Sequence, residues 1–427
     1  MLLVFWRPQE WLVPWMFGWP VLDVVVGLSL GSLMIELNEG RLRIPKELPQ
    51  IFLLGGLWIA APVSHIPHTY FAGMINSIEP VFKVCFFTLL LFVVLDRTSR
   101  LRTMIGMFVA MACFMAVHAR LQQTQGYGFA WQPPIYIPPM EDAPGYYASW
   151  FFGIFGDPND LGQFLASCIP LAFCLTKRRT LRGFLIGCAV SWLLLTALLD
   201  CHSRGAMVGL AAALATLVLT WLPDRWFPVL LAMGMVAALV MCPFAGRFLD
   251  ESAHERVVFW GEANYVFKRN FLFGIGFDMF WQILAASRAA HNAFVACYTE
   301  LGLFGYWFWF GLIQLGIISA WKTRVALKGV RSADAVWLRR FTGYSLSAMM
   351  GFCGSSYFLS RTFVYPMFFF IAMLGVLPAA ARRYVPQGEL PHLDFKKDVL
   401  YMVSLGSVGS VIYIYISIVL LNMAWSG

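Results

Sequence analysis

Residues 291–305 read HNAFVACYTELGLFG, a polar pair followed by an apolar run and two glycines three residues apart. Steps of about 100° per residue on an α-helix bring four of these residues near one face: His291, Tyr298, Gly302 and Gly305. Small residues on such a face allow a second helix to approach closely. The pattern predicts a helix that packs through its glycines, with a histidine above it at a membrane surface.

The composition around this segment is that of a membrane protein. The chain has 427 residues, of which 59% are hydrophobic and only 13% are charged, and its mean hydropathy is +0.69. A soluble globular protein is about half apolar and about a quarter charged. The net charge of +8 does not indicate nucleic-acid binding, because the basic residues form short clusters between apolar runs, as orientation signals do. The nine cysteines show no metal-ligand spacing, and most lie inside apolar runs as small buried hydrophobes.

Hydropathy divides the chain into apolar runs of spanning length. They lie at about 21–35, 50–66, 80–95, 102–118, 160–176, 182–199, 205–222, 227–243, 300–321, 341–359, 362–381 and 399–423. The sequence therefore predicts an all-α polytopic membrane protein, a single integral membrane domain over 1–427 with about 12 transmembrane helices.

The orientation of these helices follows from Lys and Arg in the short loops. Basic clusters at 41–46, 97–102, 177–182, 322–340 and 382–383 alternate with loops that carry almost no positive charge. The even-numbered loops and both termini are therefore expected outside. Two long segments, 119–159 and 244–299, then become a first and a main external loop, and long external loops are where a membrane enzyme keeps water-exposed chemistry.

Each long segment has a recognisable internal pattern. Residues 132–139 read QPPIYIPP, which predicts a stiff, extended stretch with little regular structure. Residues 156–162 read GDPNDLG, a turn with an acidic or amide side chain placed to cap the next span. In the main loop an amphipathic helix is expected to present four residues on one face: Arg256, Trp260, Ala263 and Phe267. A glycine turn, FLFGIG at 271–276, follows it.

Two arginines in these external segments are candidate phosphate ligands. Arg204 lies in the short turn DCHSRG at 200–205, and Gly205 leaves room for a close approach. A guanidinium forms two parallel hydrogen bonds to phosphate oxygens and keeps its charge. The alternative is an arginine that extends to the interface and pairs with Asp200. Arg256 can supply a second cation to the same anion, or it can be a solvated surface charge.

His291 is the candidate base, because its pKa lies near neutrality and it can accept a proton from a hydroxyl. The alternative is a structural histidine at a helix start. Asn292 is a candidate N-cap, and Tyr298 and Glu300 can orient or satisfy the site. On the helical wheel Glu300 points away from His291. The sequence lacks the paired-carboxylate signature of a metal-dependent glycosyltransferase, so we expect neither a metal nor a cofactor.

Four motifs, in order, resemble the O-antigen ligase / O-antigen polymerase superfamily, which includes bacterial protein O-oligosaccharyltransferases. His291-Asn292 with Gly302 and Gly305 is similar to an HN-x9-GxxG signature. The tripeptide 203–205 resembles the family's SRG turn, and 156–162 resembles its GxPNxxG turn. The segment from Arg256 to 276 resembles an Arg-x3-Trp…NPxxGxG pattern, with Phe271 where a proline is usual.

The resemblance implies a C-type glycosyltransferase-like fold in the bacterial inner membrane, with the active site facing the periplasm. It implies metal-independent, inverting transfer of a glycan from undecaprenyl diphosphate to the hydroxyl of a lipid, glycan or protein acceptor, in lipopolysaccharide or other polysaccharide biosynthesis. Arg204 and Arg256 would bind the diphosphate, and His291 would activate the acceptor. Five residues would support them: Ser203, Asn292, Tyr298, Gly302 and Gly305.

Two other functions remain open from the sequence. A polymerase would use the same donor and site, with a second lipid-linked glycan as acceptor. A multi-span transporter predicts buried charges at mid-membrane and broken helices in two related halves. Neither feature is apparent in the sequence, because the unusual charges gather at one surface.

Overall fold

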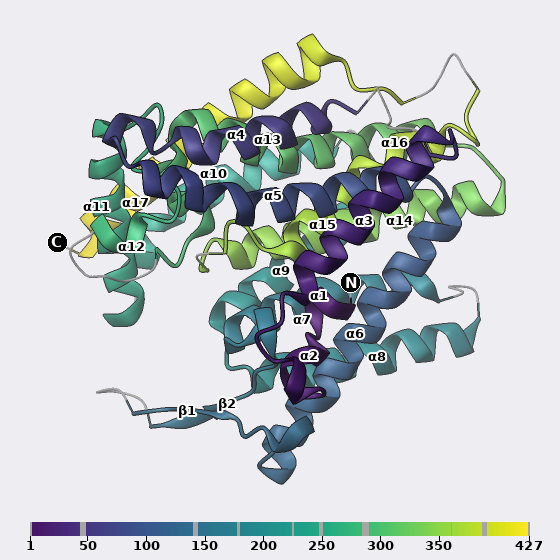
Figure 1. Cartoon of the computed structure of the whole chain (residues 1–427), viewed down its shortest axis with the longest axis horizontal. Coiled ribbons are helices and arrows are strands. Elements are labelled where there is room, and N and C mark those ends of the chain that lie inside the picture. The colour runs from purple at the N-terminus through teal and green to yellow at the C-terminus, as the bar shows by residue number, and fades with distance from the viewer. Residues whose placement is uncertain are drawn as a thin grey trace.

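The structure is a computed structural model that describes residues 2–42, 48–139, 144–176, 180–223, 226–246, 251–283, 290–359, 361–386 and 391–425. Parts of two basic clusters used above for orientation, 43–47 and 177–179, lie outside the described residues. The described chain is a bundle of helices with one small hairpin (Figure 1).

The elements follow one another in this order: α1 (Leu2–Phe5), α2 (Pro8–Trp11), η1 (Pro14–Met16), α3 (Val21–Asn38), α4 (Gln50–Val63), η2 (Ile66–His68), α5 (Phe71–Val94), α6 (Thr98–Gln125), η3 (Phe129–Trp131), β1 (Ile135–Ile137), β2 (Tyr146–Ala148), η4 (Gly153–Phe155), α7 (Pro158–Leu175), α8 (Leu181–Asp200), α9 (Arg204–Leu219), α10 (Trp226–Gly246), α11 (Glu251–Arg269), α12 (Phe280–Ile283), α13 (Ala293–Ala326), α14 (Ala333–Ser356), α15 (Tyr365–Gly375), α16 (Leu377–Ala381), the π-helix η6 (Phe395–Val403) and α17 (Ser404–Trp425).

Each of the twelve apolar runs coincides with one helix or with a consecutive pair, α15 with α16 and η6 with α17. Among the described residues, seven helices are long and apolar enough to cross a membrane: Val21–Asn38, Gln50–His68, Phe71–Val94, Thr98–Gln125, Leu181–Asp200, Ala293–Ala326 and Phe395–Met423. Three shorter apolar helices accompany them, at Arg204–Leu219, Ala232–Cys242 and Tyr365–Ala381. The chain is therefore a mostly helical, multi-pass membrane protein.

The centre of the bundle is formed by α7, α9 and α14, which pack on one another. Polar side chains join these helices: Gln163 Nε2 donates to Ser356 Oγ at 2.8 Å, and Ser347 Oγ donates to the Ala213 carbonyl at 2.6 Å. Such hydrogen bonds and small residues hold helices together where lipid supplies no hydrophobic drive between them. Polar residues at the centre also explain why α14 does not reach the hydropathy of a lipid-facing span.

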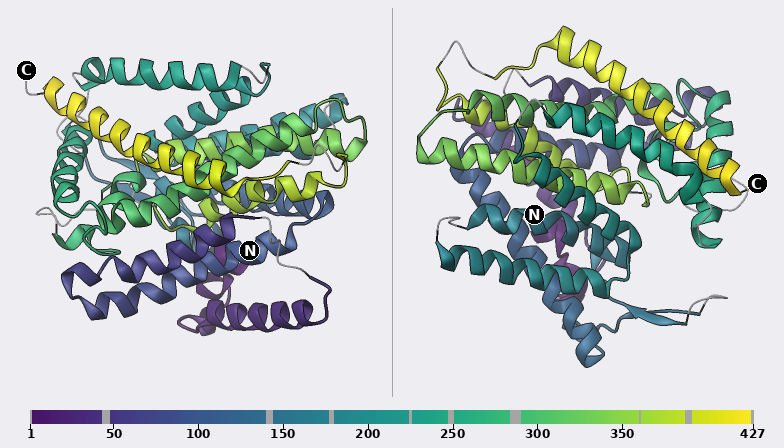
Figure 2. Two further views of the ribbon diagram at one scale, coloured as in Figure 1. Left: turned by 90° about the horizontal axis from the view of Figure 1, so that it is seen from above. Right: turned by 180° about the vertical axis from the view of Figure 1, so that it is seen from behind.

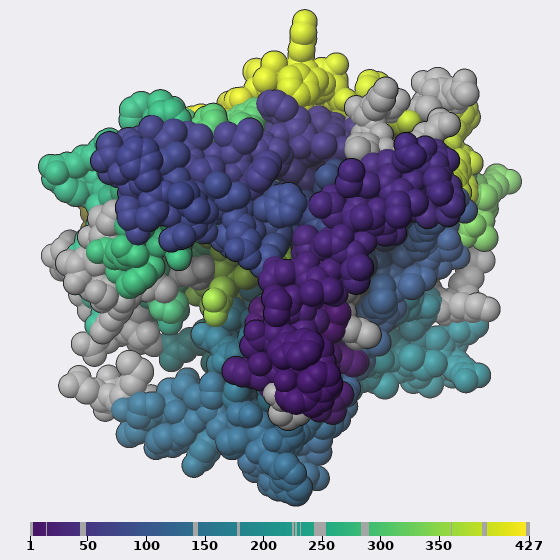
Figure 3. Space-filling view, viewed as in Figure 1, coloured from purple at the N-terminus to yellow at the C-terminus, as the bar shows by residue number. Residues whose placement is uncertain are grey.

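Lipid-facing helices surround this centre. Figure 2 shows α3 and α10 as outlying helices on opposite sides of the bundle. In the space-filling view of Figure 3 the N-terminal segment that contains α3 runs over the front surface. Large apolar side chains on α3, such as Leu28 and Met34, are exposed, as expected of a helix that contacts lipid.

The helix that follows His291 is broken, and the sequence-based prediction of one continuous face was wrong here. Gly302 has φ 64° and ψ −173°, a conformation that is almost confined to glycine. The break frees backbone groups, and the 271–276 turn satisfies four of them. Ile275 and Gly276 N–H groups donate to the Thr299 and Glu300 carbonyls at 3.0 and 2.9 Å. The N–H groups of residues 303 and 304 donate to the carbonyls of 271 and 272 at 2.7 and 3.0 Å. Gly302 is thus part of a backbone joint and does not lie on a helical face.

The proline-rich segment also differs from expectation, because it forms a short antiparallel hairpin. Strand β1 pairs with β2 in the register Ile135↔Ala148, Tyr136↔Tyr147 and Ile137↔Tyr146. The hairpin projects from the bundle at the lower left of Figure 1. Helix α6 continues to Gln125 before this segment, and α11 and α12 occupy the segment between α10 and α13, where amphipathic helices were expected.

The backbone joint predicts the effect of adding one methyl group. A Cβ on Gly302 would lie 2.3 Å from the Leu272 carbonyl oxygen, and the residue would keep a φ that L-amino acids avoid. We expect Gly302→Ala to destabilise the fold by about 1–3 kcal/mol or more, measured as a lower melting temperature in detergent by intrinsic tryptophan fluorescence. Gly106→Ala is the control, because a Cβ at Gly106 meets no atom within 4 Å. Equal melting temperatures for the two variants would contradict the proposed need for glycine at position 302 in the backbone joint.

Candidate functional site

The start of α9 places Arg204 through two linked helix caps. Ser203 accepts a hydrogen bond from the Ala206 N–H at 3.2 Å, and its hydroxyl donates to Asn159 Oδ1 at 2.7 Å. Asp157 caps α7 by accepting from the Asn159 N–H at 2.8 Å, which confirms the cap expected in the GDPNDLG turn. The starts of α7 and α9 are therefore tied together, and Arg204 is the first residue of α9.

Helix α11 carries Arg256 and is fixed to the segment around His291 at two points. Trp260, one turn after Arg256, is only 2% exposed, and its Nε1 donates to the Ala290 carbonyl at 2.6 Å. Further along, the Tyr298 hydroxyl donates to Asn264 Oδ1 at 2.7 Å. The expected amphipathic helix is thus present, and Trp260 is a positioning residue whose indole holds the backbone next to His291.

His291 lies just before α13 and not within it. Its φ of 47° is in the left-handed region, which is uncommon for a residue with a side chain. Asn292 then caps α13, as expected, because its Oδ1 accepts from the Phe294 and Val295 N–H groups at 3.0 and 3.1 Å. Strained non-glycine conformations persist where the surroundings hold them, and they are common at functional sites.

One cavity brings together the three principal candidates. Arg204, Arg256 and His291 all line a cavity of about 550 Å³, which we call the first cavity. Its other polar lining residues include Asp157, Asn159 and His202, and the β1–β2 hairpin forms one wall. Segments far apart in sequence therefore converge on one space with two guanidinium groups and an imidazole.

His291 also lines a second cavity of about 390 Å³, which contains more carboxylates. Arg361 and Asp160 form a bidentate pair across its wall, with Arg361 Nε to Asp160 Oδ1 at 2.8 Å and a second contact at 2.6 Å. Burial lowers the pKa of Arg361, but its hydrogen bonds to Asp160 and the negative charges of Asp160 and Asp157 together outweigh this, so the net pKa is raised. Burial raises the pKa of Asp278, which lines the same cavity. This second cavity adjoins the first at His291 and Asp157.

The remaining residues expected at the site act through the backbone or through packing. Asn292, Tyr298, Gly302 and Gly305 are not among the residues that line either cavity. Tyr298 is wholly buried against α11, so it supports α11 and does not orient an imidazole directly. The four positions therefore belong to the scaffold that places His291.

One detail of the sequence interpretation needs correction, and two need an addition. Glu300 lines the second cavity together with His291, because the chain before Asn292 is not helical and the helical wheel does not apply. Asp200 pairs with Arg120, with contacts of 2.7 Å. A Cβ on Gly205 would lie 3.0 Å from the Phe358 Cβ, so this glycine serves the packing of α9 on the end of α14 as well as the cavity wall.

The residues that sequence reasoning missed belong mostly to the second cavity. Arg361 was the most visible of them, since a charge between two apolar runs usually faces a cavity or a partner. Asp278 and Trp281 gave no comparable signal, because they lie singly in the segment after the glycine turn.

The fold and this site define a membrane-embedded helical protein with a cation-lined cavity at one end of the bundle. Residues 189–310 match the family model described as O-antigen ligase. This match confirms the resemblance drawn from the motifs over that segment, which is similar to the O-antigen ligase family. The matched range contains Arg204, Arg256 and the whole 291–305 segment. No curated protein and no solved structure matches the chain.

The two arginines predict that the first cavity binds diphosphate. We expect Arg204→Gln and Arg256→Gln each to raise the Kd for inorganic diphosphate about tenfold or more, because each removes charge-assisted hydrogen bonds. The measurement is isothermal titration calorimetry on the purified full chain. Arg269→Gln is the matched control, since Arg269 lies on the same helix but stacks on Tyr265 outside the cavity. A loss of affinity in this control equal to that of the other two variants would contradict a localised site.

Proposed function

We propose that the protein is an O-antigen ligase-like glycosyltransferase that moves a glycan from undecaprenyl diphosphate to an acceptor hydroxyl. The observation that carries the proposal is the meeting of Arg204, Arg256 and His291 at one cavity. The family match supports a glycan-transferring enzyme in general. The donor, the mechanism and the roles of these residues are our inference from the chemistry of the first cavity.

The chemistry assigned to each residue follows from charge. The acceptor oxygen attacks the anomeric carbon while His291 takes the hydroxyl proton. The bond from that carbon to the diphosphate oxygen breaks, and its electron pair leaves on the diphosphate. Attack opposite to the leaving group inverts the anomeric centre. Arg204 and Arg256 stabilise the charge that develops on the diphosphate, as a metal ion would in a metal-dependent enzyme.

The proposal also includes the side of the membrane on which the two cavities open. The starts of α7, α9 and α13 and the ends of α8 and α14 lie at the end of the bundle that holds both cavities. The basic clusters at 97–102 and 322–340 lie at the opposite end, where Arg102 pairs with Asp334 at 2.8 Å. From the positive-inside rule we infer that the cavities face away from the cytoplasm. The periplasm of a bacterial inner membrane, twelve crossings and a C-type arrangement are part of the proposal and rest on the family resemblance. The two periplasmic loops then lie within residues 119–159 and 244–299.

The second cavity is the proposed place of the acceptor. His291 lines both cavities, so a hydroxyl in the second cavity and a glycosyl diphosphate in the first can both reach its imidazole. The second cavity contains Arg361 already paired with Asp160, and two further acidic residues that do not line the first cavity, Asp278 and Glu300. That balance disfavours a phosphate group. Trp281, which is 49% exposed, offers an aromatic face to a sugar ring.

A transporter is the less favoured function. The break in α13 resembles the discontinuous helices of transporters, in which unwound carbonyl groups coordinate an ion. Here the Thr299 and Glu300 carbonyls accept hydrogen bonds from the 271–276 turn, so they serve the fold. A polymerase shares the proposed site, and a gene deletion separates the two enzymes. Long chains that accumulate on undecaprenol indicate a ligase, whereas loss of long chains indicates a polymerase.

The central test is transfer by the reconstituted protein. Wild-type protein in liposomes, given undecaprenyl-diphosphate glycan and an acceptor in EDTA, is expected to form product. His291→Ala should lower kcat by roughly a hundredfold or more, the usual contribution of a general base, while the Kd for diphosphate stays within about twofold. Undiminished transfer by His291→Ala would overturn the mechanism, and loss of wild-type activity in EDTA would overturn metal independence.

Placing the acceptor in the second cavity predicts a change in the KM of the acceptor but not in that of the donor. With hexyl β-glucoside as the acceptor probe, Trp281→Ala and Asp278→Asn should raise its KM about tenfold while the KM of the donor changes little. Tyr265→Ala is the aromatic control, because Tyr265 is exposed on α11 outside both cavities. Preference for the 6-phosphate of the same glucoside, or for a serine peptide, would contradict an uncharged sugar acceptor.

A further inference from the structure

A third cavity lies at the end of the bundle opposite to the candidate site. It has a volume of about 580 Å³ and is formed by the end of α9, the end of α13 and the start of α14. Helix α9 begins at Arg204 in the first cavity and ends at Leu219 beside this one. Sixteen residues of helix span about 24 Å, so the two sites lie near opposite surfaces of the membrane.

Four cations line this third cavity: Arg324, Lys328, Arg339 and Arg340. None of the described residues that line it is a carboxylate. Within the described parts of the chain, Lys328, Arg339 and Arg340 form no ion pair with a carboxylate. Neighbouring cations at the same end are paired, such as Lys322 with Asp398 at 2.5 Å and Arg102 with Asp334 at 2.8 Å. The cavity therefore concentrates positive charge that other parts of this surface neutralise.

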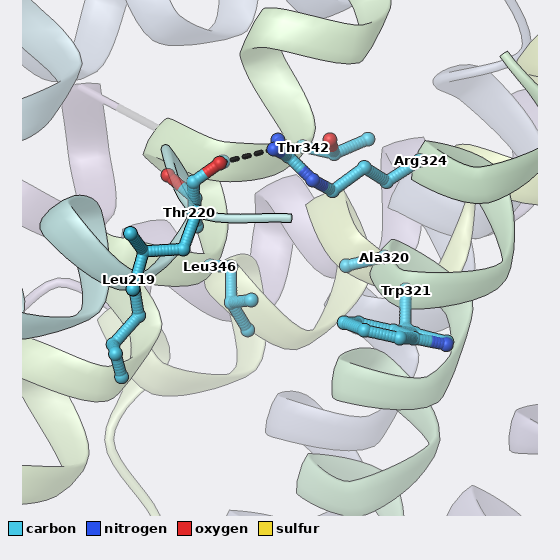
Figure 4. A pocket seen from close by; sticks show the side chains of 9 residues that line it. Leu219, Thr220, Ala320, Trp321, Arg324, Thr342 and Leu346 are labelled. Carbon is cyan, nitrogen blue, oxygen red and sulfur yellow. Dashed lines mark hydrogen bonds between the residues drawn. The ribbon is translucent and has the colours of Figure 1, made fainter. Parts of the chain in front are cut away.

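The existing contacts of these cations leave room for a further anion. Arg324 donates to the Thr220 carbonyl at the end of α9, as the dashed line in Figure 4 shows. Arg339 and Arg340 make long contacts with the Arg324 and Phe173 carbonyls, at 3.4 and 3.5 Å. The Nε of Arg340 is buried and has no hydrogen-bond partner. A buried donor of this kind costs free energy until an acceptor reaches it.

Most of the other side chains in the lining are apolar. Leu217, Val336 and Tyr344 contribute apolar surface, and Trp221 at the rim is 63% exposed. Tryptophan is typical of the membrane interface. A cavity lined by both cations and apolar side chains fits a molecule with a phosphate headgroup and an acyl chain. Basic pockets between helices at the cytoplasmic surface are known to bind anionic headgroups.

We propose that this cavity is a binding site for an anionic phospholipid, with the phosphodiester held by Lys328, Arg339 and Arg340. The bound lipid joins the ends of α9, α13 and α14, the three helices that reach the candidate site at their other ends. The positive-inside rule alone accounts for basic residues at this surface. It does not account for their convergence on one cavity whose described lining contains no carboxylate, and an experiment can test this difference.

The experiment compares melting temperatures of the full chain in phosphatidylcholine nanodiscs with and without phosphatidylglycerol. A ligand that binds only the folded state raises the melting temperature. We expect a rise for wild type and for the control Arg97→Gln/Arg100→Gln, whose arginines contact Asp96 at the same end. The rise should be lost in Lys328→Gln/Arg339→Gln. Inorganic phosphate should give no comparable rise, which separates a lipid from a free anion.

Native mass spectrometry provides an independent readout, since the Lys328/Arg339 variant should retain fewer phosphatidylglycerol molecules than the control. The single variant Lys328→Gln, at an exposed position, is the control for a folding defect in the double variant. It should lose part of the rise in melting temperature. An undiminished rise in the Lys328/Arg339 variant, or an equal loss in the control, would overturn the proposal in favour of diffuse surface charge. An equal rise with inorganic phosphate would show that the site binds a free anion and no lipid.

Discussion

The backbone joint between Gly302 and the 271–276 turn is the constraint on which the rest of the site depends. A helix break in a membrane protein exposes N–H and carbonyl groups, and each unsatisfied group costs several kcal/mol in lipid. The turn supplies four partners, so the break can exist only where the turn is present. A Cβ on Gly274 would lie 2.2 Å from the Glu300 carbonyl oxygen, and hence both sides of the joint need glycine.

The position of the turn also determines where the candidate site residues lie. The turn follows α11 directly, so fixing it against α13 also fixes the end of α11. Trp260 and Tyr298 then hold the rest of α11 to the 290–298 segment. Arg256 and His291, on separate segments, are thereby brought to the same cavity. The spacing between His291 and the glycines has a physical meaning: it sets how many residues of α13 separate the imidazole from the joint.

Sequence reasoning located the helices well, and the three principal candidates that it chose line one cavity, for identifiable reasons. Apolar length alone marks a helix in lipid, because no other open structure satisfies its backbone there. Arg204 and His291 stood out because charged and titratable residues are rare beside apolar runs. The conformation of Gly302 could not be read in this way, since it depends on a partner segment beyond the reach of helical periodicity. The second cavity was hidden for the same reason: Asp160 and Arg361 are 201 residues apart.

Charge distinguishes the two cavities that meet at His291, and it suggests why the imidazole lies between them. In the proposed mechanism a diphosphate would be attracted to the cavity with Arg204 and Arg256, and the carboxylates of the other cavity would repel it. A sugar hydroxyl has no charge to be repelled and would gain from carboxylate acceptors. Donor and acceptor would then occupy different cavities before reaction, with the proposed proton acceptor, His291, between them. If donor and acceptor shared one cavity, the protein would have to tell them apart by shape alone. Shape distinguishes two similar glycans less well than charge does.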